Sequence, residues 1–74
     1  MSTSTGQPLY WDGSYAIAKT LALRYPAVDL EEVTLSMIEQ WTLVLPDFVD
    51  DPEMVNDDLL KAIFQDWYEE VNPV

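Results

Sequence analysis

Three aspartates stand close together in this sequence, at Asp47, Asp50 and Asp51. Carboxylate oxygens at such spacing could bind a hard or borderline cation, including iron, or could pair with the basic groups of a partner. Phe48 lies between them, and we expect its ring to anchor the loop to the core while the carboxylates stay in water. Three interpretations stay open at this point: a solvated acidic loop, a weak oxygen-only cation site, and a surface for a basic partner.

A calcium-binding EF-hand loop is excluded for this stretch. Counted from Asp47, the sixth position is Pro52, where the loop requires glycine, and the twelfth is Asp58, where it requires a bidentate glutamate. The sequence has no cysteine and no histidine, so it lacks thiolate ligands, imidazole ligands and the usual general base at neutral pH. A domain of 74 residues has little volume for a desolvated pocket beside its core, and we expect no enzyme and no tightly bound cofactor.

The charge of the chain is strongly acidic, at −11, with 14 acidic residues against three basic ones. Most of it lies from residue 45 onward, where nine acidic residues accompany a single basic one, Lys61. Such a field repels phosphate backbones and anionic membranes, so we expect neither nucleic acid nor a membrane as a partner. A positively charged protein partner is favoured, although solubility alone and mimicry of DNA by acidic helices also stay open.

One domain is predicted over residues 9–74, preceded by a disordered Ser/Thr-rich tail over residues 1–8. The tail has no basic residue and no apolar run, and so lacks the features of a secretory signal. No stretch approaches the roughly 20 apolar residues that a membrane-spanning helix needs. We expect a cytoplasmic protein, and we expect it to be a monomer.

Proline and capping signals divide the domain into three helices. Asp12 is predicted to cap the first helix, which ends at Tyr25 because Pro26 follows. Its buried stripe is Ile17, Leu21 and Tyr25, with Ala18 and Ala22 beside them. Its outward positions are Tyr15, Lys19 and Leu23.

The region between the first two helices alternates apolar and polar side chains, which predicts a short edge strand over residues 31–35. Ser36 and Glu39 then form a capping-box pattern at the start of the second helix. This helix is predicted over residues 37–45. Its inward positions are Ile38, Trp41, Thr42 and Leu45.

Asn56 is predicted to cap the third helix. The inward face of this helix carries Leu60, Ile63, Phe64, Trp67 and Val71. Three helices and a short strand make a mainly α fold and are the parts of a modified winged-helix-like domain. Such a domain usually docks its third helix into DNA, but this helix is too acidic for that role. Its outward acidic residues are Asp58, Asp66, Glu69 and Glu70.

The chain from Leu9 to Glu70 resembles, without a gap, the IscX family of small acidic proteins of bacterial iron–sulphur cluster assembly. The resemblance is carried above all by Gln40-Trp41, followed at fixed spacing by Asp47-Phe48 and Asp50-Asp51-Pro52. Further matching positions are Trp11, Ser14, Ile17, Leu21, Tyr25-Pro26, Asp29, Val33, Leu45, Asn56, Leu60, Ala62-Ile63, Trp67 and Glu70. The resemblance implies a modified winged-helix fold and an accessory role in cluster assembly.

Proteins of this family bind the cysteine desulfurase IscS on a basic surface that overlaps the site of bacterial frataxin, and they bind iron weakly through surface carboxylates. The resemblance therefore implies partner-binding carboxylates at Asp29, Asp47, Asp50, Asp51, Asp66 and Glu70. It implies weak iron binding at Asp47, Asp50 and Asp51. Whether such a protein regulates the desulfurase, in competition or cooperation with frataxin, or donates iron stays open.

The exposed side of the first helix departs from the family pattern. In the family pattern this side is itself acidic, whereas here it reads Ala16, Lys19, Thr20 and Leu23, with Arg24 next to it. An iron site that used carboxylates of the first helix is therefore not expected. The acidic loop and the third helix would have to carry the charge.

Overall fold

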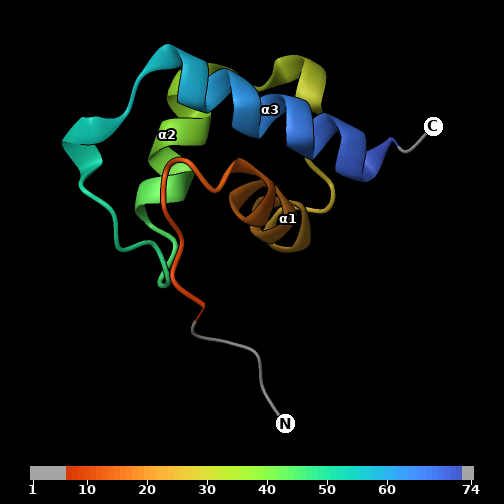
Figure 1. Ribbon diagram of the computed structural model, residues 1–74. Coiled ribbons are helices and arrows are strands. Elements are labelled where there is room, and N and C mark those ends of the chain that lie inside the picture. Colours follow the sequence, from red (N-terminus) through yellow and green to blue (C-terminus); the bar gives the residue numbers. More distant parts are fainter. Residues whose placement is uncertain (1–6, 73–74) are drawn as a thin grey trace, which may run out of the picture.

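The computed structural model describes residues 7–72 and contains three α-helices and two short 3₁₀-helices. The α-helices are α1, Ser14–Arg24, α2, Leu35–Leu43, and α3, Asp57–Val71. The 3₁₀-helices are η1, Leu30–Glu32, and η2, Pro52–Met54. Figure 1 shows α3 lying across both α1 and α2. The prediction of a mainly helical domain with three helices is confirmed.

The core lies where α3 covers the other two helices, and its most extensive contact is with α1. Ile17 and Leu21 of α1 and Ile63 and Trp67 of α3 are fully buried there. Each such side chain contributes about 1.5–3 kcal/mol by leaving water. The predicted inward stripes are confirmed apart from Val71, which is 43% exposed because it follows the last buried turn of α3.

Aromatic rings join the three helices at Trp41. Its ring stacks on Tyr25, just after α1, at 4.8 Å between centroids, and meets the edge of Trp67 at 5.9 Å. Such pairs add about 0.5–1.5 kcal/mol to the burial of the rings. Thr42, on the next position of α2, is buried as predicted. Its Oγ1 has no hydrogen-bond partner within the part of the chain that the structure describes, which costs stability.

The start of α1 differs from the prediction that Asp12 caps it. The N-cap residue is Gly13, and no side chain caps the helix. Asp12 instead lies in a tight turn closed by a 2.9 Å hydrogen bond from the Gly13 N–H to the Tyr10 carbonyl. The end of α1 is as expected: the helix stops at Arg24 because Pro26 follows the C-cap residue Tyr25.

The strand predicted over residues 31–35 is wrong. Asp29 accepts a 3.0 Å hydrogen bond from the Glu31 N–H and caps η1, and residue 35 already belongs to α2. The alternation arises because Leu30, Val33 and Leu35 pack on the core from a 3₁₀ turn and a helix start. A period of two over so few residues does not distinguish these geometries from a strand.

The second helix begins two residues earlier than predicted. Thr34, not Ser36, is its cap: Thr34 Oγ1 accepts from the Met37 N–H at 3.2 Å, and the Met37 thioether accepts from the Thr34 N–H at 3.5 Å. The predicted pairing of Ser36 with Glu39 is therefore wrong. The third cap is confirmed, since Asn56 Oδ1 accepts from the Leu59 N–H at 2.8 Å.

The winged-helix prediction is not confirmed. Within residues 7–72 the β-structure is a single isolated parallel bridge between Leu9 and Phe48, so these residues contain no wing hairpin. The predicted tail over residues 1–8 lies largely outside the described residues. No helix of the described range is both long and apolar enough to cross a bilayer.

Candidate functional site

The acidic loop is held by the segment that precedes α1. The Leu9 N–H donates to the Asp47 carbonyl at 2.9 Å, and the Val49 N–H donates to the Leu9 carbonyl at 3.1 Å. Figure 1 shows the two segments running side by side below the helices. We call residues 9–11 and 47–51 together the clasp. It closes a connection of almost 40 residues, so its bonds must offset the entropy of that closure.

Trp11 is the centre of the clasp. It is 1% exposed, and its backbone N–H donates to Asp50 Oδ2 at 3.0 Å. Its indole Nε1–H donates to the Asp51 carbonyl at 2.8 Å. The ring also meets Phe48 edge-on at 4.7 Å, which confirms Phe48 as the anchor of the loop. Trp11 thus contacts the loop at three residues, at Phe48 and Asp51 through its ring and at Asp50 through its backbone N–H.

Two of the loop carboxylates accept backbone N–H groups: Asp50 does not stay wholly in water as expected, whereas Asp51 remains exposed. Asp50 is half-buried, and both of its oxygens accept: Oδ2 from Trp11 and Oδ1 from the Asp51 N–H at 2.7 Å. Asp51 Oδ1 accepts from the Glu53 N–H at 2.9 Å and caps η2. Hydrogen bonds to a charged acceptor are worth about 1.5–3 kcal/mol each when buried and less when exposed.

The predicted iron ligands Asp47, Asp50 and Asp51 do not converge. Among residues 7–72, no three carboxylates come together in a geometry that could hold a metal ion. Oxygen ligands of this type suit a hard cation, but those of Asp50 and Asp51 already accept N–H groups. The residues present therefore do not fit a preformed iron site.

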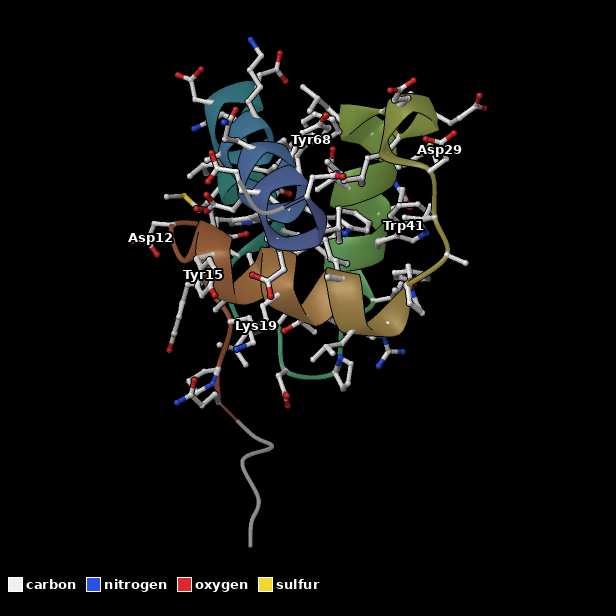
Figure 2. The ribbon with its side chains drawn as sticks, turned by 90° about the vertical axis from the view of Figure 1, so that its right-hand side faces the viewer. Asp12, Tyr15, Lys19, Asp29, Trp41 and Tyr68 are labelled. Carbon is white, nitrogen blue, oxygen red and sulfur yellow. The ribbon has the colours of Figure 1, made fainter. Side chains whose placement is uncertain are left out.

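The other predicted partner-binding carboxylates lie apart from the loop. Asp66 is half-buried and accepts a 2.6 Å hydrogen bond from Ser14 Oγ, which ties the first residue of α1 to α3. Glu70 is half-buried one turn further along α3. Asp29 is exposed and, in Figure 2, lies on the opposite side of the molecule from Asp12. The six predicted residues thus occupy three places and do not form one patch.

A shallow pocket beside the clasp was not predicted from the sequence. Its volume is about 230 Å³, and its lining consists of Tyr10, Trp11, Asp12, Asp50, Met54 and Leu59. Tyr10 is 47% exposed and Met54 is 63% exposed. In the sequence, large apolar residues stand beside acidic ones in these segments. Exposed apolar side chains of this kind are the signal that could have indicated the pocket.

The outer side of α1 is as expected from its periodicity. Tyr15, Lys19 and Leu23 are exposed, and Figure 2 shows Asp12, Tyr15 and Lys19 along the same edge of the molecule. With two of the three basic residues of the chain, Lys19 and Arg24, on this helix, the acidic field is weakest here. Exposed acidic residues lie instead on η1 with its cap Asp29, on the acidic loop and on α3.

Comparison with known proteins gives the family of this domain. A family model described as iron–sulphur cluster assembly matches residues 9–72, which is the whole domain from the clasp to the end of α3. The chain therefore belongs to the iron–sulphur cluster assembly family. Within it, an uncharacterized protein of Pseudomonas aeruginosa is 36% identical over 62 residues, covering 84% of this chain and 94% of that relative.

Proposed function

We propose that this protein is an IscX-type adaptor of iron–sulphur cluster assembly that docks electrostatically on the cysteine desulfurase IscS. It acts in the cytoplasm without catalysis of its own and adjusts sulphur transfer, in competition or cooperation with bacterial frataxin. The carboxylates proposed to attract the partner are Asp29, Asp47, Asp50, Asp51, Asp66 and Glu70, which act through the acidic field of the domain because they lie in three places and not in one patch. Family membership supports the pathway, and the charge of the chain supports the type of partner.

The observation that carries the proposal is the placement of carboxylates at a helix end whose dipole disfavours their charge, where one of them, Glu69, also accepts an exposed 3.0 Å hydrogen bond from Gln65 Nε2. Glu69 and Glu70 lie in the last turn of α3, which has no basic residue. The carbonyl end of a helix carries partial negative charge, so acidic residues there cost about 0.3–1 kcal/mol each. Charges held at a cost to stability indicate a use outside the fold, and a basic protein surface is the partner that they attract.

An iron carrier is the first rival to this proposal. Separate surface carboxylates bind iron only weakly, because no rigid set of ligands offsets the loss of the ion's water shell. Weak iron binding at Asp47, Asp50 and Asp51 is therefore compatible with the adaptor and does not require a carrier. Titration with iron(II) separates the two: tight stoichiometric binding would favour the carrier over the adaptor.

The direct test is calorimetric titration of this protein into purified cysteine desulfurase at low and at high salt. Binding at low salt that fades as salt rises is expected, because exposed charges are screened within about 10 Å at 0.1 M salt. A basic protein of unrelated fold serves as the control for nonspecific attraction. Equal binding to that control, or no heat with the desulfurase at either salt, would leave the protein as a general acidic interaction module or DNA mimic.

A further inference from the structure

We propose that the pocket beside the clasp receives an arginine side chain from the basic partner. The inference rests on the proposed function for the identity of that partner, and it adds where the contact lies and which side chain makes it. The shape, the lining and the charge of the pocket carry it.

The size of the pocket suits a single side chain. Its volume of about 230 Å³ is below the roughly 300–1,000 Å³ of clefts that enclose small-molecule ligands. It lies at the surface between the turn that precedes α1, the helix η2 and the first turn of α3, which supply Tyr10, Met54 and Leu59. A side chain projecting from a docked protein would reach it without any movement of these elements.

The lining selects a side chain with an apolar stem and a cationic head. Tyr10, Met54 and Leu59 offer apolar surface, whereas the ionisable groups of the lining that are charged at neutral pH are the carboxylates of Asp12 and Asp50. Lysine and arginine have this character, because their methylene stems pack on apolar surface while the charge remains at the polar rim. An anionic or purely apolar side chain would leave the two carboxylates unpaired beside it.

Arginine fits this lining better than lysine. Tyr10 lines the pocket and is 47% exposed as a residue, and a planar guanidinium stacks on an aromatic ring more often than an ammonium does. Its five donors are arranged as a fork that matches a carboxylate, whereas an ammonium acts as a point charge, and the lining offers the carboxylates of Asp12 and Asp50. The clasp also fixes the carboxylate of Asp50 in advance, since both of its oxygens already accept backbone N–H groups and each retains a further lone pair.

The pocket can be tested by itself, without any desulfurase. The probe is N-acetyl-arginine amide, added to ¹⁵N-labelled protein while the three indole N–H signals are followed by NMR. We expect saturable movement of the Trp11 signal with a dissociation constant on the order of 10 mM, while the Trp41 and Trp67 signals stay in place. The neutral isostere N-acetyl-citrulline amide should not move it, and N-acetyl-lysine amide should bind more weakly.

Three patterns of chemical-shift change in this titration would overturn the inference. They are equal shifts with the citrulline and arginine probes, equal binding of the lysine probe, and the same shift at all three indoles. Absence of any Trp11 shift up to about 100 mM probe would overturn it as well.

A matched pair of variants then tests the pocket within the complex. Met54→Lys places an ammonium at the pocket, and Val44→Lys makes the same change of charge at a residue outside it; the two side chains are 63% and 65% exposed. We expect Met54→Lys to weaken desulfurase binding about tenfold and Val44→Lys to weaken it about twofold at most. Equal losses of affinity in the two variants would contradict the arginine pocket and leave the proposed function in place. Lack of desulfurase binding by the wild type would contradict the proposed function. The probe titration would still decide whether the pocket binds arginine.

Discussion

In the clasp, Asp50 accepts hydrogen bonds on both carboxylate oxygens, from the backbone N–H groups of Trp11 and Asp51. Near the C-terminus, Glu69 and Glu70 lie in the last turn of α3, beside carbonyl groups that carry the same sign of charge. The two regions contain the same chemical group. In the first, the carboxylate satisfies donors that would otherwise be left unpaired, and in the second it faces a repulsive dipole.

This difference separates two uses of acidic residues in one small domain. A carboxylate that accepts backbone N–H groups positions a loop, and its removal disturbs the fold. A carboxylate at the carbonyl end of a helix contributes to the external field at a small cost in stability. Both add to the net charge of −11, so counting charges alone does not reveal which ones are available to a partner.

The largest effect should come from removing the centre of the clasp. Trp11→Ala deletes a fully buried ring and its indole hydrogen bond, and should lower the free energy of unfolding by about 3–5 kcal/mol. That is a large part of the roughly 4–11 kcal/mol expected for a chain of this length. Urea denaturation followed by circular dichroism measures it. The neighbouring variant Tyr10→Ala, at a residue 47% exposed, should cost about 1 kcal/mol or less, and equal losses would show that Trp11 is not the centre.

Asp50→Ala should come next, with a loss of about 1.5–3 kcal/mol, because it leaves the Trp11 and Asp51 N–H groups without their acceptor. Hydrogen exchange at the Trp11 amide should accelerate in the same variant. The triple change of Asp47, Asp50 and Asp51 to Asn should also destabilise, contrary to what a solvated loop predicts. If Asp50→Ala were as stable as the wild type, the Asp50 carboxylate would be a solvated group that does not support the fold.

Ser14→Ala tests whether the Asp66 carboxylate supports the fold, as Asp50 does in the clasp, or acts only through its charge at the surface. The hydroxyl donates to Asp66 Oδ2 at 2.6 Å between α1 and α3, and both residues are half-buried. Its removal should cost about 1 kcal/mol in thermal or urea unfolding. No loss of stability would assign Asp66 to the surface carboxylates that act only through their charge.

The smallest effect should have the opposite sign. The double variant Glu69→Gln/Glu70→Gln removes two charges from the carbonyl end of α3 and should raise the free energy of unfolding by about 0.6 kcal/mol, the lower end of about 0.3–1 kcal/mol for each charge. Glutamine preserves the length of both side chains. Urea denaturation at low salt measures the gain, which should shrink as salt is added. A loss of more than about 1 kcal/mol would show that these carboxylates support the fold.

Much of the helical fold could be predicted from local signals. Pro26 marked the end of α1, Asn56 marked the start of α3, and the spacing of Ile63 and Trp67 marked its buried face. Each of these signals acts within a few residues. The error over residues 31–35 had a local cause as well, since a 3₁₀ turn followed by a helix start imitates the alternation of a strand.

The clasp and the pocket could not be predicted in the same way. Trp11 contacts Asp50 and Asp51 across 39 and 40 positions of the chain, and no local pattern encodes such a pairing. The sequence placed the acidic loop correctly and identified Phe48 as its anchor. It did not reveal which carboxylates the backbone would use, because that depends on the segment brought alongside the loop by the fold.

The most direct test of this division between carboxylates is the affinity of Glu69→Gln/Glu70→Gln for cysteine desulfurase at low salt, measured by calorimetry beside the wild type. We predict that the variant, although more stable, binds about fivefold more weakly, and that the difference disappears at high salt because the lost interaction is screened. Affinity equal to that of a binding wild type at low salt would contradict the account, since the charges held at a cost to the fold would then serve no partner.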